Sequence, residues 1–114
     1  MIVDDSSSLR MVVGITLKGA GYDVIEAGDG KDALSKLTGQ KVHLIVSDVN
    51  MPNMDGLTMV EKVKQSGNQV SIIMLTTESN PSMKQRGKDA GVKGWIVKPF
   101  NGDAAIAGIK KMIS

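Results

Sequence analysis

The sequence contains no cysteine, and this absence removes several kinds of chemistry at once. Without cysteine the chain can form no disulfide, no thiolate nucleophile and no cysteine-based metal site. Histidine is almost as scarce, because His43 is the only one in the chain. Its neighbours Val42 and Leu44 are apolar, which indicates a partly packed or edge side chain rather than an acid–base catalyst.

Long apolar runs are also missing. No stretch approaches the roughly 20 apolar residues that span a bilayer, and no segment has the pattern of a signal peptide. Together with the lack of cysteine, this favours a cytoplasmic location without insertion into a membrane.

The chain has little excess charge and few aromatic residues. It contains 14 Lys and Arg against 12 Asp and Glu, and aromatic residues make up only 3%. Because the charges are interspersed and no basic run alternates with aromatics, we expect no nucleic acid among the partners. The length of 114 residues, 41% of them hydrophobic, predicts one globular domain over residues 1–114.

What the chain does contain is a regular alternation of two kinds of segment. Short apolar runs rich in β-branched residues predict strands, and longer segments with apolar residues at helical spacing predict helices. The predicted strands are residues 1–3, 22–26, 42–48, 70–75 and 92–97. The predicted helices begin near residues 6, 30, 55, 81 and 101, and the first four end at or near glycines 21, 39, 67 and 91.

Alternating strands and helices in so short a chain predict parallel strands joined by right-handed crossovers. The expected fold is therefore α/β, a doubly wound five-stranded parallel sheet of flavodoxin-like order 2-1-3-4-5 with five helices. In this order the winding reverses between the first and third strands, and a crevice forms at the carboxyl ends of the strands there.

Polar residues follow the predicted strands at that edge. Asp4 and Asp5 follow the first strand, Asp48 ends the third, Thr76 follows the fourth and Lys98 the fifth. Each has an ordinary structural explanation by itself, as a loop cap, a strand-end hydroxyl or a surface lysine. Their convergence on one edge is not explained in that way.

The chemistry of the three acids indicates a cation. Carboxylates about 5 Å apart repel each other by roughly 3 kcal/mol per pair at an effective dielectric constant of about 20. A hard divalent ion such as Mg²⁺ relieves this repulsion, and it prefers oxygen ligands. Asp48 could then attack phosphorus as a carboxylate nucleophile, while Lys98 neutralises the phosphoryl oxygens and Thr76 supplies a hydroxyl.

These motifs together resemble the receiver domain of two-component response regulators, specifically the single-domain CheY type. The resemblance covers almost the whole chain, and its motifs occur in the right order at the right strand ends. They are Ile2-Val3-Asp4-Asp5, Asp48 with Met51-Pro52 and Asp55-Gly56, Thr76, and Lys98-Pro99-Phe100.

The resemblance implies a role for each matching residue. Asp48 is the expected phosphoacceptor, and Thr76 and Lys98 are the expected contacts of the phosphoryl group. The expected magnesium ligands are Asp4, Asp5, Asp48 and the backbone carbonyl of Asn50, with Asp4 acting through bound water.

The resemblance also implies a switch and a limited lifetime of the signal. Thr76 and Trp95 are the expected switch residues, although proteins of the CheY type usually carry tyrosine at the latter position, and a packed strand tryptophan is the simpler alternative. Asn50 and Glu78 are expected to set the rate of spontaneous dephosphorylation. The protein is thus expected to be a self-phosphorylating and autodephosphorylating signalling domain, not an enzyme with a separate substrate that it turns over. The expected partners are a histidine kinase as phosphodonor and a downstream protein, such as a flagellar motor switch, on the face of the fourth helix, fifth strand and fifth helix.

Other functions remain open at this point. Within the family, the chain could be a phosphate sink, a phosphorelay intermediate or a receiver cut from a longer regulator. A flavodoxin-like electron carrier shares the topology, but Asp4-Asp5 occupies the loop where such a carrier needs a phosphate-binding Ser/Thr/Gly sequence. An aspartyl-phosphate phosphohydrolase is the other alternative, although haloacid-dehalogenase-type enzymes have Asp-x-Asp rather than adjacent acids.

Two local features carry further expectations. Because a cis bond costs X-Pro only about 0.5 to 1 kcal/mol, and because the resemblance implies it, we predict a cis bond between Lys98 and Pro99. The first strand has only three residues before the acids, whereas strands average about 5 to 6. We therefore expect the first strand to be truncated, which predicts reduced stability and the formation of dimers or the exchange of terminal elements between copies.

Overall fold

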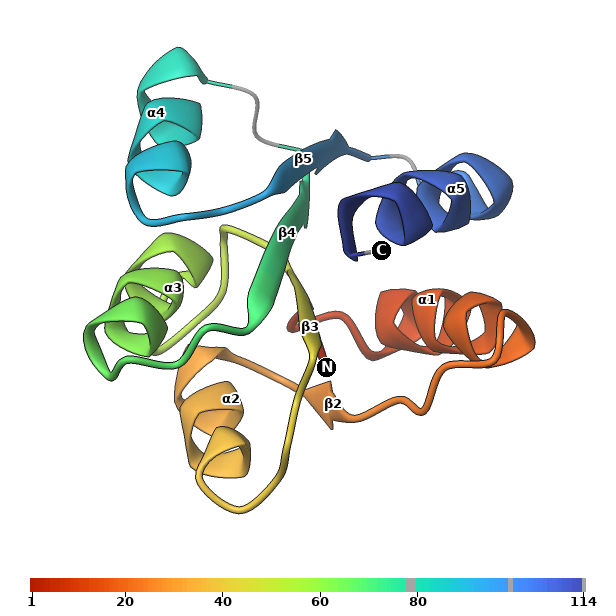
Figure 1. The fold of residues 1–114 in the computed structure, drawn as a ribbon, viewed down its shortest axis with the longest axis horizontal. Coiled ribbons are helices and arrows are strands. Elements are labelled where there is room, and N and C mark those ends of the chain that lie inside the picture. The colour runs from red at the N-terminus through yellow and green to blue at the C-terminus, as the bar shows by residue number, and fades with distance from the viewer. Residues whose placement is uncertain (78–79, 99, 114) are drawn as a thin grey trace.

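The computed structural model describes residues 1–77, 80–98 and 100–113. Five parallel strands form one sheet of order β2-β1-β3-β4-β5, which confirms the predicted fold class (Figure 1). The strands are β1 (Ile2–Val3), β2 (Glu26–Ala27), β3 (Leu44–Ser47), β4 (Ser71–Thr76) and β5 (Gly94–Val97). The helices are α1 (Ser7–Gly19), α2 (Gly30–Leu37), α3 (Gly56–Gln65), α4 (Pro81–Asp89) and α5 (Gly102–Ile113).

The helices cover the sheet on both faces. In Figure 1, α1 and α5 lie together on one side, and α2, α3 and α4 lie on the other. Successive strand residues point to opposite faces, so each strand supplies two cores. In β3, Ile45 belongs to the core under α2 and α3, while Val46 belongs to the core under α1 and α5. The apolar runs of β3 and β4 are thus explained by burial on both faces.

The predicted helix starts are confirmed by their caps. The side chain of Ser6 accepts a hydrogen bond from the amide of Leu9, and Asp55 accepts one from Thr58 at 2.8 Å. Asp29 and Asn80 cap α2 and α4 in the same way. Each cap satisfies an amide that has no partner within the first turn of its helix. None of the described helices is long and apolar enough to cross a bilayer.

The predicted extent of the second strand was wrong. Residues 22–26 were expected to form it, but β2 comprises only Glu26 and Ala27. The paired segment is short because β1 comprises only Ile2 and Val3, which pair with Glu26 and Ala27. The carbonyl of Ile25 still accepts a hydrogen bond from the amide of Ile2 at 2.8 Å, but the strand propensity of Val24 and Ile25 does not lengthen β2.

Candidate functional site

The register of the central strands places two of the acids level with each other. Val3 of β1 pairs with Ser47 of β3, and the next residues along the two strands are Asp4 and Asp48. The amide of Asp48 donates to the carbonyl of Val3 at 2.9 Å, so the ladder continues to the site. Parallel pairing therefore fixes the backbone of both acids at the same edge of the sheet.

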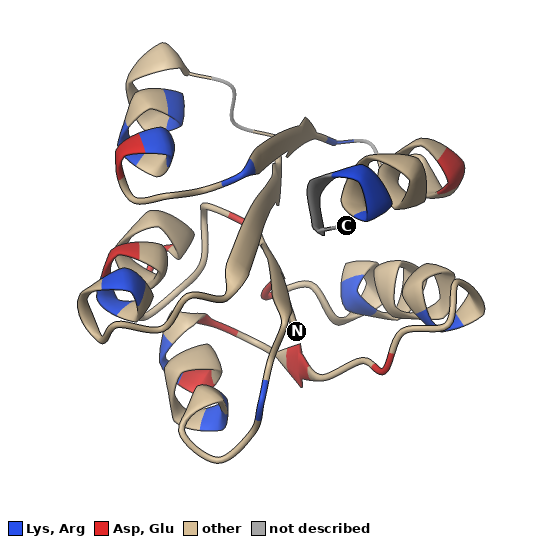
Figure 2. Cartoon of the chain, in the orientation of Figure 1, with Lys and Arg blue, Asp and Glu red and all other residues tan. Residues whose placement is uncertain are grey.

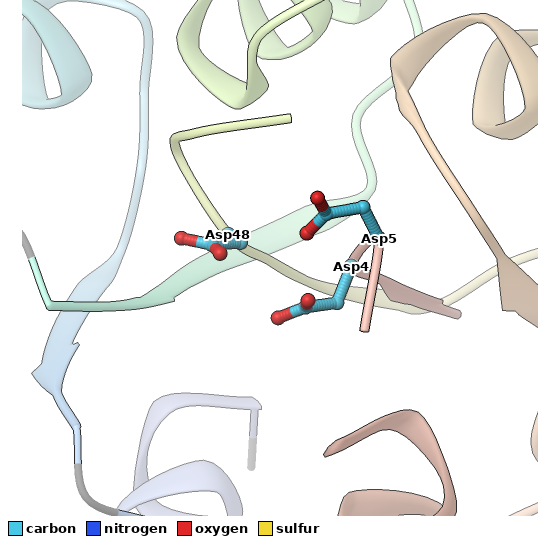
Figure 3. Close-up of side chains that lie close together, drawn as sticks. All are labelled: Asp4, Asp5 and Asp48. Atoms are coloured by element: carbon cyan, nitrogen blue, oxygen red, sulfur yellow. The ribbon is translucent and has the colours of Figure 1, made fainter. Parts of the chain in front are cut away.

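The three predicted acids come together as expected. Carboxylate oxygens of Asp4, Asp5 and Asp48 lie within 4.8 Å of one another (Figure 3). Asp4 and Asp48 are buried, whereas Asp5 is exposed. The cluster is thus open to solvent on the side of Asp5 and closed by the sheet below.

Lys98 provides the positive charge of the site. Its Nζ lies 3.2 Å from Oδ2 of Asp4 and 3.2 Å from Oδ2 of Asp48, so one ammonium bridges the two buried carboxylates. Burial alone lowers the pKa of Lys98, but the two carboxylates outweigh this effect and the pKa lies above its ordinary value. Lys98 is consequently held in its charged form.

The charges of this cluster do not balance. Burial raises the pKa of Asp4, although the Ser6 amide and Lys98 oppose this rise. Arg10 also lies nearby, donating to the carbonyl of Asp4, but its guanidinium is paired with Glu26 at 3.1 Å. Three carboxylates facing one ammonium leave an excess of negative charge that suits a divalent cation with oxygen ligands, as Mg²⁺ is.

Thr76 and Trp95 lie on one face of the sheet. Thr76 is fully buried at the end of β4 and pairs with Val97, while Met74 pairs with Trp95. Since residues two apart on a strand point the same way, Thr76, Met74 and Trp95 share the face covered by α3 and α4. The amide of Lys98 donates to the carbonyl of Thr76 at 2.9 Å, which joins this pair of strands to the acid cluster.

The structure does not test the roles predicted for three further residues, Asn50, Glu78 and Pro99. Asn50 lies exposed in the loop after β3, close in sequence to Asp48. Glu78 and Pro99 lie outside the described residues. The expected contribution of Glu78 to turnover and the cis bond between Lys98 and Pro99 therefore stay predictions.

Sequence reasoning missed the importance of Gly56 for the geometry of the site. The amide of Gly56 donates to the carbonyl of Val49 at 2.7 Å. A Cβ atom at this position would lie 1.9 Å from the carbonyl oxygen of Asp48, closer than any side chain allows. The pair Asp55-Gly56 was available as a motif, but only the structure shows that the loop after Asp48 folds back onto the start of α3.

A second residue that the sequence did not single out is Val49. Its amide donates to Oδ1 of Asp48 at 2.7 Å, while Oδ2 of the same carboxylate contacts Lys98. The two oxygens of Asp48 thus have different partners, and the carboxylate is held in one orientation. Because the donor is a backbone group, no residue type could have indicated it.

The fold and the site define a doubly wound α/β domain with an acid cluster at the edge of its sheet, and comparison with known proteins identifies its class. Residues 1–110 match the family model described as the response regulator receiver domain. The chain belongs to this family. The expected resemblance is confirmed, and the protein is a CheY-like receiver of two-component signalling rather than a metabolic enzyme.

Individual relatives support the same conclusion. The chemotaxis protein CheY of Bacillus subtilis is 36% identical over 115 residues, covering 100% of this chain and 96% of its own. The structure of chemotaxis protein CheY4 of Vibrio cholerae is 43% identical with a TM-score of 0.92, covering 97% of this chain and 94% of its own. TrrA of Thermotoga maritima, solved in complex with Mg²⁺-BeF, is 28% identical with a TM-score of 0.87, and the match covers 97% and 95% of the two chains.

Proposed function

We propose that this protein accepts a phosphoryl group from a histidine kinase on Asp48 and transmits the signal through a change of conformation. The observation that carries the proposal is the pairing of Asp48 with Lys98 beside two further carboxylates. Each part has a use in phosphoryl transfer, which depends mainly on positioning and on neutralising charge.

The nucleophile is prepared by its surroundings. The Val49 amide and the Lys98 ammonium hold the two oxygens of Asp48, so the carboxylate loses little freedom when a donor arrives. A carboxylate oxygen then forms a bond to phosphorus as the bond from phosphorus to the donor imidazole breaks, and the imidazole nitrogen takes up a proton. Lys98 stays within reach of the phosphoryl oxygens and offsets their charge.

Mg²⁺ is the proposed cofactor. Asp5 and Asp48 would supply carboxylate oxygens, Asp4 would act through bound water, and the backbone carbonyl of Asn50 would supply another oxygen. The described site contains neither histidine nor cysteine. When bound, the ion neutralises charge on the phosphoryl oxygens and on the acids. The Mg²⁺-BeF complex of the related TrrA supports this choice of ion.

The signal passes from the phosphoryl group to the face of α4, β5 and α5. We propose that the buried hydroxyl of Thr76 contacts the phosphoryl group and that Trp95, on the same face of the sheet, changes its packing in response. Asn50 and Glu78 then set the rate at which water removes the phosphoryl group spontaneously, so the signal is short-lived.

The cellular process is proposed from the relatives. Proteins from Bacillus subtilis and Helicobacter pylori that are 36% and 40% identical are chemotaxis proteins. We therefore propose a chemotaxis-type role in the cytoplasm, with a flagellar motor switch as downstream target.

Mass spectrometry after incubation with acetyl phosphate and Mg²⁺ tests the phosphoacceptor. The wild type should gain one labile phosphoryl group, and Asp48→Asn should gain none. Asp103→Asn, which changes an exposed acid on α5, is the matched control and should behave as the wild type does. Equal labelling of Asp48→Asn and wild type would refute the assignment.

A further inference from the structure

α4 is attached to the rest of the protein by few contacts. Of its nine residues only Gly87 is buried, and Met83 adds a partly buried contact with the core. Its charged residues are mainly basic, as Figure 2 shows. Because little apolar area holds this helix in place, any specific contact at its surface has a large influence on its position.

The most specific of these contacts is made by Arg86. Its Nε lies 3.0 Å from Oε2 of Glu61 and its Nη2 lies 2.6 Å from Oε1. The guanidinium thus forms a bidentate pair with a carboxylate on α3. Nη2 also donates to Oγ1 of Thr58 at 3.2 Å. The hydrogen bonds of this fork lower the pKa of Glu61 and raise that of Arg86, since each stabilises the charged form of the other. Bidentate pairs of this kind fix the relative orientation of the two side chains as well as the distance between them.

The residues that Arg86 contacts continue to the phosphoacceptor loop. Oγ1 of Thr58 donates to Oδ2 of Asp55 at 3.1 Å, and Asp55 caps α3. The next residue, Gly56, lies directly against the carbonyl of Asp48. A continuous series of contacts therefore runs from the backbone of Asp48 through the first turn of α3 to α4.

The residue after Arg86, Gly87, brings α4 against the ring of Trp95. A Cβ atom added to Gly87 would lie 3.2 Å from Cζ3 of Trp95 and 3.6 Å from Leu57. The absence of a side chain at Gly87 lets the helix backbone approach the ring this closely. A displacement of α4 must therefore change the surroundings of Trp95, which provides an optical report on the helix.

We propose that Arg86 is a positioning residue that latches α4 onto α3 in the resting state and so sets the equilibrium of the switch. This inference rests on the proposed function, because it supposes that occupation of the Asp48 site favours another placement of α4. A ligand that prefers the second state binds more weakly while the latch holds the first. Removing the latch should therefore tighten binding at Asp48, although Arg86 touches no atom of that site.

The test measures the binding of beryllofluoride at saturating Mg²⁺ by calorimetry and by Trp95 fluorescence. Arg86→Met removes the fork but keeps the aliphatic stem, and Glu61→Gln removes the charge of its partner. Lys84→Met is the matched control, because it removes an exposed positive charge from the same helix. Partly exposed ion pairs are weak, so the expected tightening is about 1.5- to 5-fold for Arg86→Met and Glu61→Gln, with no change for Lys84→Met.

Two further measurements keep the proposal falsifiable. The double variant should bind no more tightly than either single variant, because both remove the same contact. Without ligand, α4 amides should exchange hydrogen faster in Arg86→Met than in wild type. Unchanged or weakened binding by both single variants would overturn the latch. Failure of the wild type to bind beryllofluoride would instead refute the proposed function.

Discussion

The edge of the sheet that carries the acids and helix α4 are held in place in opposite ways. Asp4 and Asp48 are buried and continue paired strands, and Lys98 bridges them. α4 buries one glycine and is tied to α3 by partly exposed polar side chains. Chemistry needs groups fixed in advance, whereas a response needs an element that moves at small cost in free energy. The protein places these two requirements on different elements.

Among the variants proposed here, Gly56→Ala should have the largest effect, because it disturbs the loop that holds the backbone of Asp48 in place. A methyl group 1.9 Å from the carbonyl oxygen of Asp48 forces the loop away from α3. We expect a loss of about 1 to 3 kcal/mol in the free energy of unfolding, measured with urea, together with slower phosphorylation. Gly39→Ala is the control, since nothing lies within 4 Å of its added Cβ, and it should change stability by less than about 0.5 kcal/mol. Equal effects of the two variants would contradict the account of Gly56.

Magnesium should sharpen the comparison, because it binds at the acid cluster and not at α4. Because the ion binds the folded acid cluster and relieves its repulsion, saturating Mg²⁺ should raise the free energy of unfolding by about 1 to 3 kcal/mol. Asp5→Asn removes a carboxylate from the cluster and should reduce this gain. Thermal unfolding with and without Mg²⁺ decides the matter, and an identical gain in the variant would exclude Asp5 as a ligand.

A smaller effect is expected from Asp4 in the absence of Mg²⁺. Its pKa is raised in the folded state by burial, so its contribution to stability is complete below the ordinary pKa of 3.8 and is lost as the pH rises through the raised value. Asp4→Asn should therefore gain stability relative to wild type as the pH rises across this range and keep that gain at neutral pH. Urea unfolding at several pH values checks this, and a constant difference at all pH values would show that Asp4 is not the cause.

Much of the site could be predicted because it depends on strand order. Once the strands are parallel and β1 lies beside β3, residues that follow the strands must meet, and Asp4, Asp48 and Lys98 do so. Helix starts were predictable for a similar reason, since a cap such as Asp55 acts on amides of its own first turn.

The remaining features depend on contacts between segments that are far apart in the sequence. Arg86 and Glu61 are separated by 25 residues, and neither has a neighbour in sequence that indicates the other. The extent of β2 depends on how many residues β1 offers as partners. On α1, Val12 is 52% exposed although its apolar neighbours Val13 and Leu17 are buried. Apolar residues cover more than one side of this helix, so periodicity alone could not identify the buried face.

Hydrogen exchange of the wild type, with and without beryllofluoride and Mg²⁺, tests the central claim most directly. The claim is that a fixed site at the sheet edge controls a weakly held α4. Upon binding, exchange should change in α4 and around Trp95, while the protection of β3 and β4 should stay the same or increase. Bound ligand with no change in α4, or with loss of protection in β3 and β4, would contradict the account.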